Sequence, residues 1–168
     1  MLFRLSKIAL IAAVAFFLLL VVFNNLTDYG SNYGFVFHVL AMDTTFPGNS
    51  GMWRSISSVP VYHLFYASII LWETVAMGLI AAGAWRLWRV RGADAKTFNR
   101  AKGLVVLGLT VNLLQWLVAF LTIGAEWFLM WQSRTWNGQE AAFRMFACVA
   151  LVLLYASRDD AELADTLL

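Results

Sequence analysis

An unbroken run of sixteen apolar residues, from Ile8 to Phe23, most constrains what this chain can fold into. About 20 residues of helix span the hydrocarbon of a bilayer, so this run and its flanking residues are long enough to cross one. Arg4 and Lys7 precede the run as in a signal peptide, but no small-x-small cleavage pattern follows it. We therefore predict a retained membrane helix at about residues 5–24.

Three more apolar stretches predict further membrane helices at about residues 61–88, 102–128 and 139–157. The composition agrees, because 61% of the residues are hydrophobic and only 13% are charged, against roughly a quarter charged in soluble domains. Strict alternation of apolar and polar residues, which a membrane barrel requires, is not seen. The sequence predicts a single all-α membrane domain over residues 1–168, a bundle of four transmembrane helices.

Positively charged residues are distributed unequally between the two sides of this bundle. Nine lie on the side of the N-terminus and of the loop after the second helix, and three lie on the other side. The first group is Arg4, Lys7, Arg86, Arg89, Arg91, Lys96, Arg100, Lys102 and Arg158, and the second is Arg54, Arg134 and Arg144. The positive-inside rule then predicts a multi-pass protein of the bacterial inner membrane with both termini in the cytoplasm. We expect the acidic tail, residues 159–162 with Asp165, to be a solvated cytoplasmic end.

The predicted extracytoplasmic loop between the first two helices, about residues 25–60, is unusually long. Connections of this length without a function are uncommon in compact domains. The apolar segment from Phe35 to Met42 is suited to a short helix at the membrane interface. The loop is predicted to be structured, either as a cap that closes the bundle or as a lid over a polar pocket. Candidate residues of an extracytoplasmic rim are His38, Asp43, Arg54, His63 and Glu126.

Polar residues within the predicted spans indicate a second candidate site. At about 1.5 Å per residue, Glu73 and Gln115 each lie roughly 20 Å from a basic residue at the cytoplasmic end, and Arg144 lies roughly 21 Å from one. Charged residues at such depth are costly and usually face the protein interior. We predict that Glu73, Asn112, Gln115 and Arg144 form a polar core. Structural pairing, a ligand or ion site, and proton transfer all remain open roles for it.

The third helix is predicted to turn one polar and small-residue stripe toward this core. The stripe, at steps of three and four residues, is Gly108, Asn112, Gln115, Ala119, Thr122 and Glu126. The first helix has no polar residue between Ile8 and Phe23, so we expect it to pack at the periphery, with the core made mostly by the other three helices.

The sequence lacks the residues or motifs that several common kinds of site require. A net charge of +2 is too small for a nucleic-acid surface, and the single cysteine, Cys148, excludes an internal disulfide or a CxxC pair. No HExxH, GxSxG, Walker A or GxGxxG motif occurs. A haem held by His38 and His63 would need the loop to fold back onto the second helix. We predict no catalytic residues, no metal and no cofactor.

Several blocks of the sequence resemble the DUF2165 family, which comprises predicted small integral membrane proteins of bacteria. These blocks are residues 24–30, 38–49, 52–54, 83–86, 124–133 and 136–139, together with Glu73. The resemblance covers nearly the whole chain. It implies four helices in a bacterial inner membrane and no assigned activity.

The function that these observations favour is that of a non-enzymatic accessory or interaction subunit. Its expected partners are the lipid bilayer and a larger membrane complex, with no nucleic acid and with the homo-oligomeric state left open. One alternative is a small-molecule or ion binding or transport module with a polar cavity under the extracytoplasmic loop. A second is a membrane anchor that binds quinone or haem.

Overall fold

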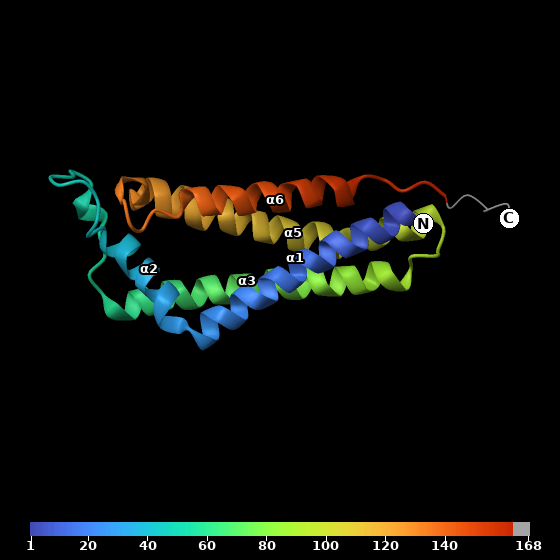
Figure 1. The fold of residues 1–168 in the computed structure, drawn as a ribbon, viewed down its shortest axis with the longest axis horizontal. Helices are drawn as coiled ribbons and strands as arrows, with labels where there is room; N and C mark the ends of the chain where they lie inside the picture. Colours follow the sequence, from blue (N-terminus) through green and yellow to red (C-terminus); the bar gives the residue numbers. More distant parts are fainter. Residues whose placement is uncertain (163–168) are drawn as a thin grey trace.

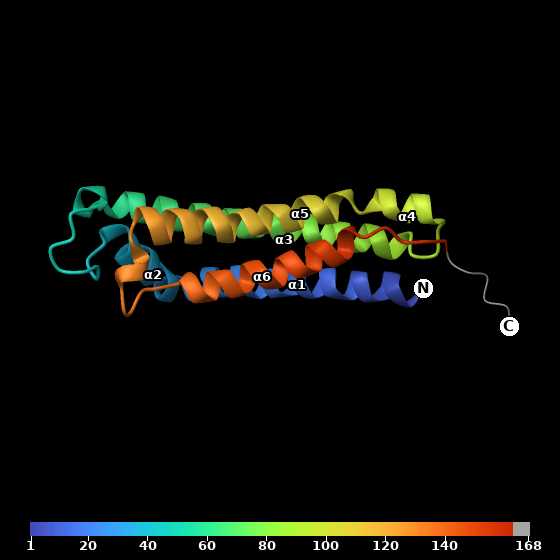
Figure 2. The same ribbon diagram turned by 90° about the horizontal axis from the view of Figure 1, so that it is seen from above.

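The computed structural model describes residues 1–162, which form helices and connecting loops without a strand. Figures 1 and 2 show long helices lying side by side in an elongated bundle. Four stretches are long and apolar enough to cross a membrane, and they confirm the predicted all-α four-helix bundle. They are α1 (Leu2–Thr27), α3 (Val59–Arg89), α4 (Ala95–Ala101) with α5 (Gly103–Leu114) and η2 (Gln115–Trp127), and α6 (Gln139–Ser157).

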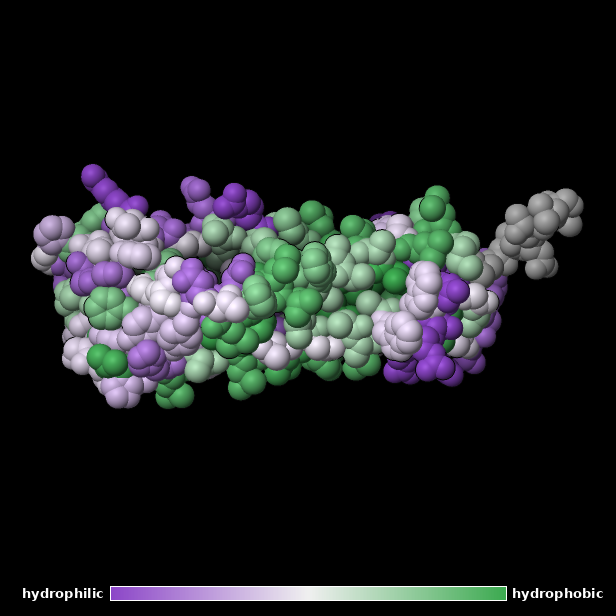
Figure 3. All heavy atoms as spheres, turned by 60° about the horizontal axis from the view of Figure 1, so that its bottom comes forward, coloured by the Kyte–Doolittle hydropathy of each residue, from purple (hydrophilic) through white to green (hydrophobic). Residues whose placement is uncertain are grey.

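The two ends of the bundle are built differently. One end, which we call the loop end, carries α2 (Tyr29–Ala41), two short 3₁₀ turns, η1 (Met52–Arg54) and η3 (Met130–Gln132), and the loops beside them. The other, which we call the basic end, holds the N-terminus, α4 and residues 158–162 (Figure 2). On the face that Figure 3 shows, a broad and mostly apolar belt lies between the ends. Such a belt fits the hydrocarbon of a bilayer.

Two glycines allow α3 and α5 to approach closely. A Cβ atom on Gly83 would lie 2.8 Å from the backbone nitrogen of Val105, and one on Gly108 would lie 2.9 Å from that of Ile80. Small residues at such crossings are typical of membrane helices, whose association depends on close packing. Both contacts follow one antiparallel register. The same register sets Gln115 opposite Glu73 and Asn112 opposite Ala76.

The first helix is not peripheral, contrary to the prediction. Ile8, Ile11, Ala15 and Leu18 of α1 are buried in one apolar cluster with residues of α3, α5 and α6. An apolar residue gives the same signal whether it faces lipid or protein, so the composition of α1 could not distinguish the two. Only the polar residues near its ends could have indicated that it belongs to the core.

The second half of the third span, η2, is a π-helix, in which hydrogen bonds join residues five apart. At the end of η2, for example, the Phe128 N–H donates to the Ile123 carbonyl. Each turn therefore holds more residues than in an α-helix. The buried residues recur after nine positions: Gln115, Trp116, Gly124 and Ala125. Thr122 and Glu126 are exposed. The predicted polar stripe is wrong beyond Gln115, because it assumed an α-helical period.

A buried ion cluster closes the basic end. Asp160 Oδ2 lies 2.7 Å from both Lys7 Nζ and Lys102 Nζ, and all three side chains are at most 6% exposed. Asn99 exchanges two hydrogen bonds of 3.0 Å with the backbone of Asp160, and Arg4 donates to the carbonyl of Ala161. These contacts tie the segment after α6 to α1 and to the α4–α5 corner. The acidic tail is therefore not simply solvated; Asp165 lies outside the described residues.

The ion cluster makes a prediction for stability. Burial alone would raise the pKa of Asp160, but the hydrogen bonds and charges of Lys102 and Lys7 outweigh it and hold that pKa below the ordinary value. A carboxyl whose pKa is lowered in the folded state stabilises it above the unfolded pKa, and loses this contribution as the pH falls through the folded value. The Asp160→Asn variant should lose on the order of 3 kcal/mol at pH 7, since two buried lysines lose their counter-ion.

Thermal unfolding of the purified protein in detergent measures this loss. The matched control is Asp159→Asn, which removes an exposed carboxylate from the adjacent position and should leave the melting temperature unchanged. The difference between the wild type and Asp160→Asn should begin to shrink below about pH 4, where the unfolded carboxyl becomes neutral, and should be lost as the pH falls through the lower pKa of the folded state. Equal melting temperatures of the two variants at pH 7 would contradict the stabilising role of the cluster.

Candidate functional site

Glu73 lies in the interior of the bundle, near the middle of α3. It is fourteen residues from Val59 and sixteen from Arg89, roughly 21 and 24 Å along the helix axis. The side chain is 3% exposed. Asn25 Nδ2 donates to Glu73 Oε2 at 2.7 Å, and Gln115 Nε2 donates to Glu73 Oε1 at 3.1 Å. One carboxylate therefore joins the end of α1, the middle of α3 and the start of η2.

Asn25 connects Glu73 with the loop end. Its Oδ1 accepts hydrogen bonds from Asn32 Nδ2 at 2.6 Å and from the Tyr66 hydroxyl at 3.2 Å. Asn32, on α2, is exposed, whereas Asn25 and Tyr66 are buried. A chain of polar side chains thus leads from the loop-end surface to the carboxylate. The candidate site residues predicted from the sequence did not include Asn25 and Tyr66, although an asparagine two residues from the end of α1 was a signal for the former.

Asn112 and Gln115 offer polar atoms that have no partner within residues 1–162. Asn112 is 1% exposed, and neither its Nδ2 nor its Oδ1 forms a hydrogen bond. Gln115 is 0% exposed, and its Oε1 is also without a partner. Buried polar atoms are nearly always satisfied in native proteins. Asn112 and Gln115 lie one helical turn apart beside Glu73. This part of the core therefore contains buried polar atoms whose hydrogen bonds are not formed within residues 1–162.

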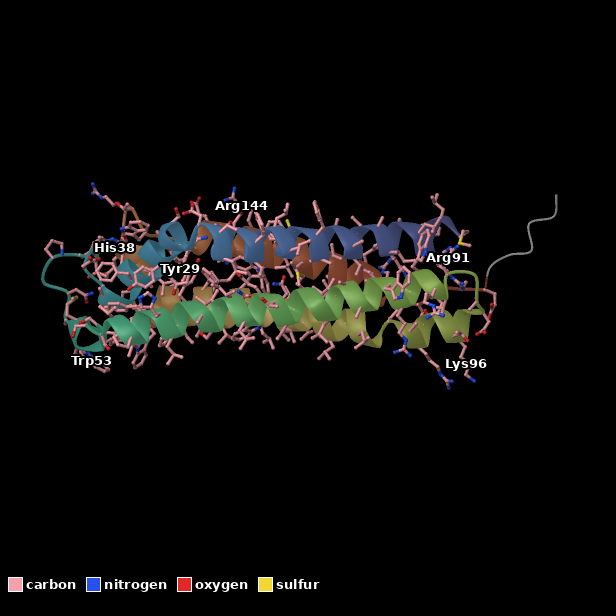
Figure 4. The ribbon with its side chains drawn as sticks, turned by 90° about the horizontal axis from the view of Figure 1, so that it is seen from below. Tyr29, His38, Trp53, Arg91, Lys96 and Arg144 are labelled. Atoms are coloured by element: carbon pink, nitrogen blue, oxygen red, sulfur yellow. The ribbon has the colours of Figure 1, made fainter. Side chains whose placement is uncertain are left out.

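The structure brings Glu73 and Gln115 together and leaves Arg144 out. Arg144 is exposed, and Figure 4 shows its side chain projecting outward from the bundle. No ion pair joins it to Glu73 or to another described carboxylate. The predicted pairing with Arg144 is therefore wrong. Depth along a helix can be counted from the sequence, but the face of α6 that packs is set by Ala142, Val149 and Ala156, which are buried on another side.

The five predicted rim residues fall into three separate groups at the loop end. His38 Nδ1 lies 2.8 Å from Asp43 Oδ2, and its ring stacks on Trp136 with centroids 4.6 Å apart. His63 Nδ1 lies 2.8 Å from the Tyr29 hydroxyl. Each histidine thus has its own hydrogen-bond partner: that of His38 lies just after the end of α2, and that of His63 is the first residue of α2. This arrangement gives no support to a haem held between them.

Arg54 and Glu126 form the third group, but through the backbone. Arg54 donates to the carbonyls of Glu126 and Trp127 at 3.4 and 3.2 Å, and its guanidinium lies over the rings of Trp53 and Trp127. The Glu126 side chain is exposed. Trp53 lies at the tip of the loop end (Figure 4). These contacts hold residues 52–54 against the end of η2 and indicate a structural role.

The space beneath α2 is apolar. A cavity of about 140 Å³ lies between α2, α3 and η2, and its walls include Val36, Leu40, Ile69 and Phe120. Ser68 and the indole of Trp72 are the polar groups that line it, and the Trp72 Nε1 donates to the carbonyl of Val111. The expected polar cavity under the loop is not found there. Of residues 1–162, no group of three histidine, cysteine or acidic side chains is placed to hold a metal.

Comparison with known families supports the resemblance seen in the sequence. A family model described as a predicted small integral membrane protein, DUF2165, matches residues 3–158. Among curated proteins and solved structures, nothing matches the chain. The family assignment therefore brings the membrane class and no activity.

The network around Asn25 predicts different effects for two neighbouring asparagines. Asn25→Leu removes a donor from Glu73 and an acceptor from Tyr66, and should destabilise the protein by about 1–3 kcal/mol for the buried groups that it leaves unpaired. Asn24→Leu, at an exposed position, should have little effect. Thermal unfolding in detergent compares the two variants. Equal melting temperatures would show that the hydrogen bonds of Asn25 do not stabilise the core.

Proposed function

The chain belongs to the DUF2165 family of small integral membrane proteins, and we propose that it acts as a non-catalytic interaction subunit that associates through α6. The observation that carries this proposal is the position of Arg144. A charged side chain within a membrane helix almost always faces the protein interior or a partner. Arg144 is five residues inside α6, on an exposed apolar face, and has no carboxylate partner among residues 1–162.

The exposed face of α6 has the pattern of a helix-pairing seam. Its residues recur at steps of four and three: the exposed Glu140, Arg144, Leu151 and Leu154, with the half-buried Ala147 between them. Leu151 and Leu154 are 67% and 66% exposed, and Ala147 provides a small residue at the centre. This face is opposite Ala142, Val149 and Ala156, which pack on the bundle. Such spacing is typical of helices that pack along one seam.

A second copy of this chain is the partner that the charges favour. Glu140 and Arg144 lie one turn apart on the same face, and Glu140 also lacks an ion pair within the described part of the chain. In a two-fold symmetric pair of parallel helices, Glu140 of each copy lies about 6 Å along the helix axis from Arg144 of the other, an offset that an arginine side chain can span diagonally. Two ion pairs then form where each arginine alone would face lipid. We propose this dimer as the unit that takes part in a membrane complex.

Oxidative cross-linking tests the dimer, because the natural chain has a single cysteine. We expect Ala147→Cys, in a Cys148→Ser background, to form a disulfide-linked dimer in native membranes. A disulfide can join residues whose Cα atoms are within roughly 7 Å, and two copies of residue 147 at the centre of the seam come that close. The matched control is Leu71→Cys in the same background, on the exposed face of α3. Cross-linking that is equal at the two positions, or absent from Ala147→Cys, would contradict the proposal.

Charge exchange tests the ion pairs directly. In the Ala147→Cys, Cys148→Ser background, Glu140→Arg should reduce the cross-linked fraction because it sets four positive charges together. Adding Arg144→Glu restores opposite charges across the seam and should recover the cross-link. Failure of the double exchange to recover it, with both variants folded, would show that these charges do not pair between copies.

We also propose that the basic end faces the cytoplasm of the bacterial cell and that the loop end faces the periplasm. Arg86, Arg89, Lys96 and Arg100 are exposed at the basic end, whereas Arg54 and Arg134 are the basic residues of the loop-end connections. The positive-inside rule supports this orientation.

Labelling with a membrane-impermeant thiol reagent tests the orientation. Trp53→Cys and Lys96→Cys, each in a Cys148→Ser background, place single thiols at exposed positions on opposite ends of the bundle (Figure 4). We expect Trp53→Cys to react in spheroplasts and Lys96→Cys to react only after the membrane is opened. The reverse pattern would contradict the proposed orientation.

A further inference from the structure

We propose that Glu73, Gln115 and Asn112 form a binding site for an alkali-metal cation, entered from the loop end. This site is separate from the α6 face and does not depend on the proposed dimer. Its ligands would be a carboxylate and two amide oxygens, since hard cations are bound by oxygen ligands.

Charge is the first reason. Within residues 1–162, Glu73 has two amide donors but no positively charged neighbour. The buried cations Arg4, Lys7 and Lys102 lie at the basic end, around Asp160 and backbone carbonyls. An isolated carboxylate in an apolar interior is unstable unless it is neutralised. One monovalent cation neutralises it, whereas a divalent cation would leave a net positive charge in the same place.

The unpartnered oxygens are the second reason. Gln115 Oε1 and Asn112 Oδ1 are buried and form no hydrogen bond, while the other amide atom of Gln115 already contacts Glu73. Because Asn112 and Gln115 are three residues apart, they share the face of the helix that the α3–α5 register turns toward Glu73 and Ala76. The amide donors of Asn25 and Gln115 bind the oxygens of Glu73, whereas the two amide oxygens accept no hydrogen bond within residues 1–162 and can bind a cation. Asn112 Nδ2, also unpartnered, can donate to a water of hydration.

Access is the third reason, and it is one-sided. From the loop end, exposed Asn32 and buried Asn25 lead to the carboxylate through hydrogen bonds of 2.6 and 2.7 Å. Toward the basic end, buried Ala76, Ile80, Val105 and Leu109 belong to one apolar cluster. A cation can be held at Glu73, but the described interior offers it no polar path onward. The arrangement is that of a binding site and not of a conduction pathway.

The experiment measures thermal unfolding of the full-length chain in detergent at pH 8. NaCl, KCl or LiCl replaces N-methyl-D-glucamine chloride at constant ionic strength. We expect the melting temperature to rise with the concentration of at least one alkali cation and to saturate, because a ligand that binds only the folded state stabilises it. Glu73→Gln should abolish the rise. Asn112→Leu should raise the half-saturating concentration on the order of tenfold, as expected for one lost ligand.

Controls separate the site from general salt effects. Glu126→Gln removes an exposed carboxylate at the loop end and should retain the full rise. A wild-type melting temperature that is the same in all four salts would overturn the proposal, because a cation that binds only the folded state must raise it. A rise that persists in Glu73→Gln would overturn it as well. If Glu73→Gln does not fold, the titration of Asn112→Leu decides, and an unchanged half-saturation overturns the site. None of these outcomes depends on cross-linking through α6.

Discussion

The carboxylate of Glu73 holds the arrangement of the first three spans at mid-bundle. Membrane helices gain little from hydrophobic burial against one another, because lipid is equally apolar, so polar contacts and close packing carry much of their specificity. Glu73 accepts one hydrogen bond from Asn25 of α1 and one from Gln115 of η2. These two bonds fix the register of α3 against both neighbours. The glycine contacts at Gly83 and Gly108 then allow the same register to continue toward the basic end.

The two ends of the bundle are stabilised by different interactions. At the basic end, Asp160 pairs with Lys7 and Lys102, so charges close the bundle where the apolar belt ends. At the loop end, stacked aromatic rings contribute instead of a buried ion cluster: Tyr33 stacks on His63 and His38 on Trp136. The polar side chains of Asn32 and Asn25 lead from the loop end to Glu73.

The sequence predicted the class and the number of helices well, since the length and apolarity of a span are direct consequences of bilayer thickness. It also predicted that Glu73 and Gln115 lie at the same level, because depth follows from counting residues along a helix. It predicted the packed face of the third span as far as Gln115, where Gly108, Asn112 and Gln115 are buried, but not the packed faces of η2 and α6. The π-helical period of η2 turned Thr122 and Glu126 outward, and the packing of Val149 turned Arg144 outward. The role of α1 was hidden because lipid and protein are equally suitable surroundings for its apolar residues.

The separation of Glu73 from Arg144 has a consequence for the whole molecule. Had the two side chains met, as their depths allowed, they would have neutralised each other within one chain. Instead the carboxyl group is inside the bundle and the guanidinium group is on its outer face. We propose partners of different kinds for the two groups, a small ion for the interior and another helix for the outer face. The two proposals together assign a ligand site and an assembly surface to one chain of 168 residues.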